Sequence, residues 1–219
     1  MAVRREEARD HDGGTPPPDG IPAGFHPAGA PVPEVMRTAR ALLRPLRTTD
    51  VDLDYDAVMS SAAELRRCRG SEWPRDGFTL EENLADLERH EREHIERKAF
   101  TYTVLNPEGT RCLGCVYIVP VWAEAADIRG AAACAACVGF WVRASEIEHD
   151  LDKHLLAVLL EWFRSAWPFD CVLFTNYVAD TRQAALLAET GLSRHSLAWP
   201  DGRTGSAFRA TWPSHASRS

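Results

Sequence analysis

Apolar residues recur at helical spacing along several stretches of the chain. In the most apolar stretch, 151–167, Leu155, Leu156, Leu159 and Phe163 fall on one face of a helix. Asp50 is a residue type that commonly caps the start of a helix, and Thr79 followed by Glu82 is the capping-box pattern that begins another. Gly191 is a residue type that commonly ends one. The pattern predicts helices at 34–40, 51–69, 79–98, 151–167 and 181–190.

Between these helices the hydrophobic pattern changes to that of strands. Residues 112–121 are rich in β-branched side chains, and 171–177 form a short apolar run typical of a buried strand. Turn residues at 106–109 and at 200–202 separate the strands of two hairpins. The predicted strands are 41–46, 100–105, 112–121, 137–143, 171–177, 193–199 and 206–212.

This succession of elements resembles the fold of the GNAT acyltransferases. Four segments are similar to parts of that fold: Leu43–Leu46 to its opening strand, Gly114–Ile118 to its third strand, Leu155–Phe163 to the helix after the cofactor loop, and Gln183–Leu192 to its late helix. The resemblance implies an α/β domain over residues 36–213. It implies a GNAT-like mixed, mostly antiparallel central sheet flanked by helices.

The resemblance also implies a site for acetyl-CoA. In the family, acyl-CoA lies between two parallel strands that splay apart, here 139–143 and 171–177. The pantetheine arm pairs with strand backbone. The diphosphate binds N–H groups at a helix N-terminus, where exposed donors and the helix dipole favour an anion. The cofactor-binding residues expected here are Phe140, Trp141, Val142, Arg143, His149, Asp150, Leu151, Asp152 and Lys153.

The cofactor loop departs from the family pattern at two positions. Asp150 and Asp152 stand where the family has glycines, so side chains occupy the space that a close backbone approach needs. Each carboxylate at ~5 Å from a phosphate charge would cost roughly 3 kcal/mol at an effective dielectric of ~20. Asp152 is interpreted as the N-cap of the following helix. Lys153, His149 and Arg143 are the residues that would compensate for the two acids.

The expected catalytic residues also differ from the family pattern. Leu187 occupies the late-helix position where a tyrosine is usual, so Tyr177 is the candidate acid. Glu146 and Glu148 are the candidate bases because strand 139–143 carries no carboxylate.

The acceptor side is expected to be lined by aromatic residues. Tyr55, Trp73 and Tyr117 are the expected substrate contacts. The resulting prediction is an N-acyltransferase that moves an acyl group, most simply acetyl, to a small-molecule or peptide amine. The alternative is a GNAT-fold pseudoenzyme or binding module that has lost conventional CoA binding.

Two motifs match metal sites by spacing. His90-Glu91-Arg92-Glu93-His94 matches the H-E-x-x-H zinc-protease pattern. The helix around it is highly charged, however, and is expected to be exposed to solvent. Cys112-x-x-Cys115 and Cys134-x-x-Cys137 match a four-thiolate zinc site. The cysteines of each pair, placed on strands, are expected to point to opposite faces. We therefore assign no metal ligand, and a zinc-stabilised module stays as a third hypothesis.

Composition and charge limit the partners and the cellular compartment that we expect for the domain. The chain has 219 residues, 45% of them hydrophobic, and a formal net charge of -7, which disfavours nucleic acid or an anionic membrane as partner. Residues 1–35 are rich in Pro and Gly and predict a disordered tail. With no export signal seen, we expect a cytoplasmic protein with reduced thiols. A homodimer through the last strands stays open.

Overall fold

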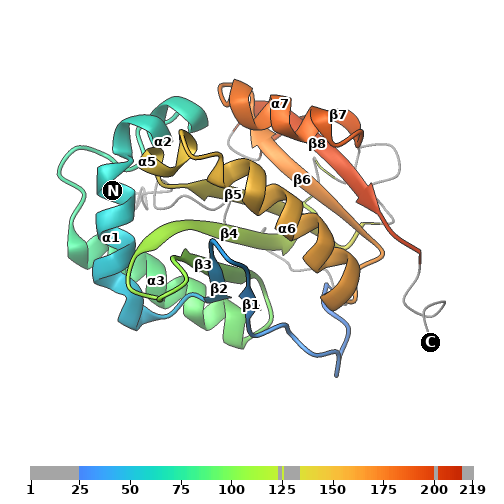
Figure 1. Ribbon diagram of the computed structural model, residues 1–219, viewed down its shortest axis with the longest axis horizontal. Coiled ribbons are helices and arrows are strands. Elements are labelled where there is room, and N and C mark those ends of the chain that lie inside the picture. The colour runs from blue at the N-terminus through green and yellow to red at the C-terminus, as the bar shows by residue number, and fades with distance from the viewer. Residues whose placement is uncertain (1–24, 123–124, 126–133, 200–201, 214–219) are drawn as a thin grey trace, which may run out of the picture.

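Eight strands form one sheet in the computed structural model, which describes residues 25–122, 125, 134–199 and 202–213 (Figure 1). Their order across the sheet is β1-β2-β3-β4-β5-β6-β8-β7. β5 and β6 pair in parallel, and the other neighbouring strands pair antiparallel, which confirms the predicted mixed sheet. The strands are β1 (Met36–Arg37), β2 (Leu42–Pro45), β3 (Phe100–Leu105), β4 (Cys112–Pro120), β5 (Ala136–Val142), β6 (Cys171–Tyr177), β7 (Ser193–Ala198) and β8 (Thr204–Thr211).

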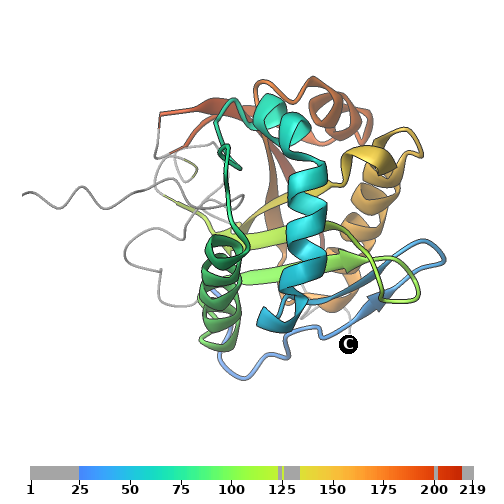
Figure 2. The ribbon, with the colours of Figure 1, turned by 90° about the vertical axis from the view of Figure 1, so that its left-hand side faces the viewer.

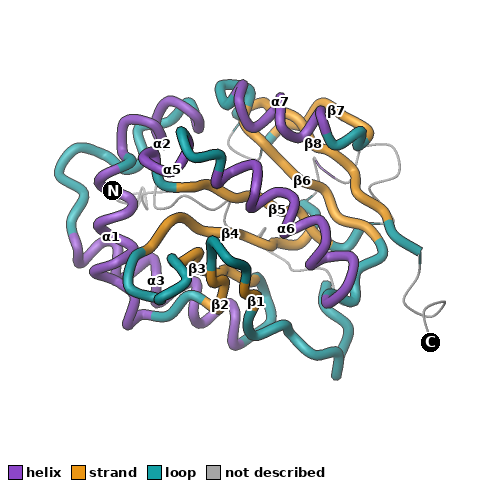
Figure 3. Tube along the Cα trace, in the orientation of Figure 1, coloured by secondary structure: helices purple, strands orange, loops and turns teal. Residues whose placement is uncertain are grey.

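Helices cover both faces of the sheet, as Figures 2 and 3 show. On one face lie α6 (Leu151–Ala166) and α7 (Thr181–Glu189). On the other lie α1 (Val51–Ser60), α2 (Ala62–Arg69) and α3 (Leu80–Ile95). A 3-10 turn (Thr48–Asp50) leads into α1, and a short helix, α5 (Ala144–Ile147), precedes α6.

The largest hydrophobic core lies between α6 and the sheet. Leu155, Leu156, Leu159 and Phe163, the predicted apolar stripe of α6, are all buried there. Burial of each such side chain contributes about 1.5–3 kcal/mol. This packing fixes the start of α6 beside the end of β5, where the cofactor loop was predicted.

Three local predictions are corrected by the structure. The helix expected at 34–40 is instead the short strand β1, which pairs with β2. The helix expected at 51–69 is divided into α1 and α2 at Ser61. Asp50 occupies the N-cap position of α1, but its carboxylate accepts hydrogen bonds from Arg44 at 2.6 and 2.7 Å instead of capping the helix.

The folded domain begins earlier than predicted. Phe25, counted with the tail in the sequence analysis, is buried and stacks on Phe100 with ring centroids 5.6 Å apart. The hydroxyl of Tyr102 donates to the carbonyl of Pro33 at 2.6 Å. Phe25 and Pro33 therefore contact the sheet, and residues 1–24 of the predicted tail lie outside the described residues.

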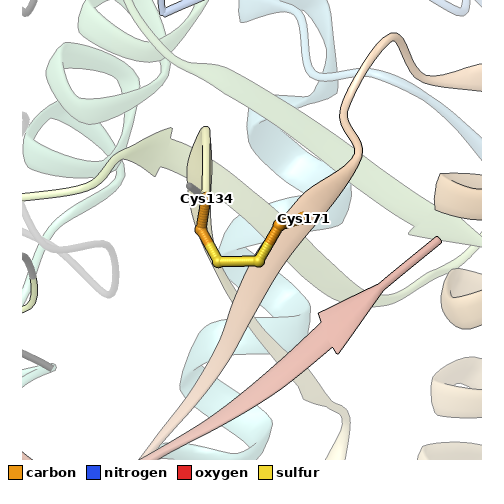
Figure 4. The surroundings of a disulfide bond; sticks show 2 residues. All are labelled: Cys134 and Cys171. Carbon is orange, nitrogen blue, oxygen red and sulfur yellow. A yellow bond between two sulfur atoms is a disulfide. The ribbon is translucent and has the colours of Figure 1, made fainter. Parts of the chain in front are cut away.

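A disulfide joins Cys134, just before β5, to Cys171, the first residue of β6 (Figure 4). The expectation that all thiols stay reduced is therefore wrong for this pair. Cys68, Cys112, Cys115 and Cys137 are free. The disulfide ties together the two strands that pair in parallel, at the end where they are hydrogen-bonded.

Within the described part of the chain, no helix combines the length and apolar character that crossing a membrane requires.

Candidate functional site

The parallel strands β5 and β6 separate after a short paired region. Backbone pairing joins Ala136 to Val172, Cys137 to Leu173 and Val138 to Phe174, and it ends there. Beyond these residues β5 continues its pairing with β4, and β6 continues its pairing with β8. The two strands therefore splay, as the resemblance predicted for a cofactor cleft.

A cavity of about 70 Å³ lies at this splay. Its walls come from the end of α2 (Cys68, Arg69), from β4 (Tyr117), from β6 (Asn176, Tyr177) and from the start of α7 (Asp180). Trp122 and Trp199 complete it. Ligand pockets for drug-sized molecules have volumes of roughly 300–1,000 Å³. The cavity is thus suited to a small group.

The splay leaves backbone and amide groups of β5 and β6 without strand partners. The carbonyl of Phe140 accepts a buried hydrogen bond of 2.9 Å from Nε2 of Gln183. Asn176 donates its amide hydrogens to the carbonyls of Tyr177 (2.9 Å) and Asp180 (3.2 Å), while its Oδ1 is buried with no partner among the described residues. The cleft therefore holds one acceptor already satisfied by α7 and one unsatisfied acceptor.

Two tyrosines and one carboxylate bring proton-transfer chemistry to the cavity. Burial raises the pKa of Tyr117, whose hydroxyl accepts a hydrogen bond of 3.2 Å from Nε1 of Trp141. Tyr177 stacks on Trp199 with ring centroids 4.4 Å apart. Burial also raises the pKa of Asp180, which caps α7 by accepting a 2.9 Å hydrogen bond from the backbone N–H of Gln183. A buried carboxyl with a raised pKa is a better proton acceptor at neutral pH than an exposed one.

The loop before α6 is closed by an arginine from α7. Arg182 Nε donates to Oδ2 of Asp152 at 2.5 Å, and its Nη2 donates to Oδ1 of Asp152 (2.9 Å) and of Asp150 (2.8 Å). Nη2 also lies 3.2 Å from the carbonyl of Ile147. The two acids thus partly neutralise one cation of the fold and are not free to repel a ligand at full strength.

The helix start itself differs from the predicted arrangement. Asp150, not Asp152, is the N-cap of α6, and it adopts the left-handed conformation (φ 53) that glycine favours. Asp152 lies in the first turn, and its Oδ1 accepts a hydrogen bond of 2.9 Å from the N–H of Lys153. The N–H groups of His149 and Asp150 bond to Glu146 and Ile147. Turn bonds and the Asp152 side chain occupy these three donors, and two carboxylates lie at the same helix start, so the loop as it stands disfavours a diphosphate.

The other predicted loop residues face away from this point. Arg143 is buried and forms an ion pair with Asp56 of α1. Lys153 pairs with Glu189 at 3.8 Å on the surface, and the side chain of His149 is exposed. The structure therefore brings neither Lys153 nor Arg143 to Asp150 and Asp152, and Arg182 takes that role.

The remaining cofactor residues belong to the core or the cavity wall. Phe140 and Trp141 line the cavity, while Val142 and Leu151 are buried in the main core. Leu187, at the position where a tyrosine was expected, is also fully buried in that core.

Of the catalytic and substrate-binding residues predicted from the sequence, some line the cavity and the others make contacts elsewhere in the fold. Glu146 pairs with Arg111 at 2.6 Å, and Glu148 is an exposed side chain beside His149. Tyr55 donates to the carbonyl of Phe78 at 2.9 Å, and Trp73 packs under Arg69. Among the residues proposed from sequence for catalysis or the acceptor, Tyr117 and Tyr177 line the cavity.

The two histidines of the H-E-x-x-H motif face the sheet and not solvent, contrary to the sequence interpretation. His90 is buried, and its Nδ1 lies 3.0 Å from Oγ1 of Thr101. His94 packs edge-on against the rings of Phe100 and Tyr102. Within the described part of the chain no three His, Cys, Asp or Glu side chains are grouped to hold a metal ion.

The four cysteines of the zinc-like spacing lie in two separate places. A register shift in β3–β4 pairing, between Val104 and Leu105, lets Cys112 and Cys115 share one face beneath α1, so the expected opposite orientation is wrong for them. Cys134 and Cys137 lie in a second cluster, where Cys134 is bonded to Cys171.

Sequence reasoning missed four residues of the site: Arg69, Asn176, Asp180 and Arg182. The signal for Asp180 was present, because an Asp directly before a predicted helix is an N-cap that holds its carboxylate at the helix start. No local signal marks Arg182 or Arg69, whose positions depend on how α7 and α2 pack.

Comparisons with known proteins agree with this architecture. No protein-family model matches the sequence, and no curated protein matches it. Among solved structures, the ribosomal L7/L12 alpha-N-protein acetyltransferase RimL in complex with coenzyme A has 13% sequence identity and a TM-score of 0.64, over 81% of this chain and 98% of that chain. Microcin C7 self immunity acetyltransferase MccE in complex with acetyl-CoA and AMP has 10% identity and a TM-score of 0.63, over 80% and 94%.

A mycobacterial protein of known structure gives the same result. Mycobacterium smegmatis RimJ in complex with CoA-disulfide has 18% identity and a TM-score of 0.61, over 82% of this chain and 86% of that chain. At such identities the similarity concerns the fold. The splayed β5 and β6, the order of the strands and these matches agree, and the chain has the fold of the GNAT acetyltransferases.

Proposed function

We propose that this protein is an N-acyltransferase that moves an acyl group from a thioester donor to an amine bound in the cavity at the β5–β6 splay. The observation that carries the proposal is the end of backbone pairing at Val138 and Phe174, which opens directly onto Asp180 and Tyr177. The solved proteins of the same fold that bind coenzyme A or acetyl-CoA support a thioester donor.

The donor, when bound, supplies an activated acyl carbon, and the side chains of the cavity handle the protons. A protonated amine loses one proton to become a nucleophile and a second proton when the amide forms. Asp180 accepts the first and passes it to solvent. Tyr177 gives its proton to the departing thiolate, and the second amine proton restores the tyrosine. The N–C bond forms as the C–S bond breaks.

The donor site implies that the enzyme discriminates little between acyl donors with and without the diphosphate. The splay of β5 and β6 supports a site for the thioester arm, whereas the loop closed by Arg182 disfavours a diphosphate. We therefore propose that the arm contributes most of the donor's binding energy. Acetyl-CoA and S-acetylpantetheine, which lacks the diphosphate and nucleotide, should then be used with similar kcat/KM.

Acetyl transfer to a panel of amines, followed by mass spectrometry with each donor, tests this function. Tyr177→Phe and Asp180→Asn should lower kcat by roughly 10²-fold or more, the usual contribution of a positioned acid or base. Arg164→Gln, at an exposed ion pair of α6, is the matched control and should keep full activity. No transfer from either donor to any amine would overturn the proposal.

A second candidate function is favoured by the Asp150–Arg182–Asp152 bridge. If the bridge keeps every thioester donor out, the protein is a GNAT-fold binding module whose ligand is the amine alone. Calorimetry separates the two functions, because a binding module would give heat with an amine and none with either donor.

A further inference from the structure

Arg69, at the end of α2, is a buried cation. It is 7% exposed, and its guanidinium lies 4.7 Å from the ring centroid of Trp73. Among the described residues no carboxylate pairs with it. Arg143, which is 6% exposed, is by contrast paired with Asp56. A buried charge is costly unless it is paired, so Arg69 is suited to an anion that enters the cavity it lines.

Two further residues that line the cavity, Asn176 and Asp180, carry acceptor oxygens. Oδ1 of Asn176 is buried and has no partner among the residues that the structure describes. The orientation of this amide is fixed because both partners of its nitrogen are carbonyl oxygens. The carboxylate of Asp180 lies at the start of α7, near the thiol of Cys68, the residue next to Arg69. Two acceptors in one small cavity require a ligand with several N–H donors, which a primary ammonium supplies.

We propose that the acceptor substrate is a small free α-amino acid, of the size that a cavity of about 70 Å³ admits, bound with its carboxylate at Arg69 and its ammonium at Asp180 and Asn176. This inference rests on the proposed function only in the step that follows binding, the transfer of an acyl group to the amine. Trp122 and Trp199 form the apolar wall for the amino-acid side chain. The N-terminus of a peptide is disfavoured, since its first carboxyl group is an amide and would leave Arg69 unpaired.

The test is calorimetry on the full chain without any acyl donor, using matched probes. L-Alanine, L-leucine and L-phenylalanine are compared with ethylamine, 3-methylbutylamine and phenethylamine, which lack the carboxylate. They are also compared with propionate, 4-methylpentanoate and 3-phenylpropionate, which lack the ammonium. At least one amino acid should bind roughly tenfold or more tightly than both of its analogues, the loss expected for one hydrogen bond to a charged group.

Two variants assign the charges. Arg69→Gln should remove the preference for the amino acid over the amine and leave amine affinity unchanged, whereas a merely structural defect would weaken both. Asp180→Asn keeps an N-capping residue on α7 and should remove the preference over the acid. Arg164→Gln should change neither preference.

The outcomes separate this inference from the proposed function. Amino-acid binding with both preferences but without acyl transfer would sustain the inference and overturn the transferase. Acyl transfer to simple amines with no gain from a carboxylate would sustain the transferase and overturn the inference. Amino-acid binding that Arg69→Gln leaves unchanged would also overturn it.

Discussion

Arg182 binds both carboxylate oxygens of Asp152, with Nε 2.5 Å from Oδ2 and Nη2 2.9 Å from Oδ1. The two residues are 30 positions apart, so the contact joins the first turn of α7 to that of α6. The same guanidinium reaches Asp150. The positive start of α6, which in this fold could receive an anionic ligand, is therefore engaged inside the protein.

Removing the two acids should restore an anion site. In the double variant Asp150→Gly/Asp152→Ala, the left-handed position gains the residue that favours it, and both Arg182 and the N–H of Lys153 lose their partners. We expect acetyl-CoA to bind roughly tenfold or more tightly than to the native chain, since one unfavourable charge pair is worth about 3 kcal/mol. Calorimetry measures the change.

The control for this gain is Arg182 itself. Adding Arg182→Gln to the double variant should reduce the improvement, because the freed guanidinium provides part of it and the removal of the two carboxylates provides the rest. Equal affinity of the native chain and the double variant for acetyl-CoA would show that the bridge does not govern donor binding.

Gln183 should contribute to stability through the carbonyl of Phe140. Gln183→Leu leaves this buried acceptor without its 2.9 Å hydrogen bond. The free energy of unfolding should fall by about 1–3 kcal/mol, the penalty for an unsatisfied buried polar group. Urea unfolding measures it. Glu189→Gln, at an exposed position of the same helix, should stay within about 0.5 kcal/mol of the native value, and an equal loss there would refute the assignment.

The elements predicted best are those with strong local signals. α6 has a continuous apolar stripe, β6 is a short apolar run, and the Thr79–Glu82 capping box begins α3 where expected. The order of these helices and strands along the chain was enough to indicate the fold, because each of them can be predicted from its local pattern without knowledge of long-range side-chain contacts.

The details that sequence reasoning missed all depend on contacts between distant residues. The sequence predicts Asp152 as the N-cap of α6, but in the structure Arg182 of α7 binds that side chain. Cys112 and Cys115 were placed by strict strand alternation, and the register shift beside them changes which face they share. Arg69 lay in a polar helix with no sign that its end would be buried.

The Cys134–Cys171 disulfide should stabilise the domain. It closes a loop with a sequence separation of 37, for which the loss of chain entropy in the unfolded state corresponds to about 4 kcal/mol. A reductant should lower the free energy of unfolding by an amount of this order. Thiol titration of the unfolded chain should find four free thiols before reduction and six after it.

Cys134→Ser provides the matched control for the disulfide. The variant should be destabilised like the reduced protein, and the reductant should have no further effect on it. A native chain whose unfolding is insensitive to reductant, or that titrates six thiols without it, would contradict the prediction.

Asp86 of α3 should make stability depend on pH. Asp86 is 8% exposed, its Oδ2 is buried with no partner in the part of the chain that the structure describes, and burial raises its pKa to about 6 from an ordinary 3.8. A raised carboxyl pKa means that the fold favours the protonated form. Its contribution is complete below pH 3.8 and is lost as the pH rises through about 6.

Asp86→Asn cannot ionise. It should therefore match the native chain near pH 4 and exceed its free energy of unfolding by up to about 3 kcal/mol at pH 7. Urea unfolding at both pH values measures this difference, with the exposed Glu88→Gln on the same helix as control. An equal gain at the two pH values would mean that Asp86 acts through packing and not through its charge.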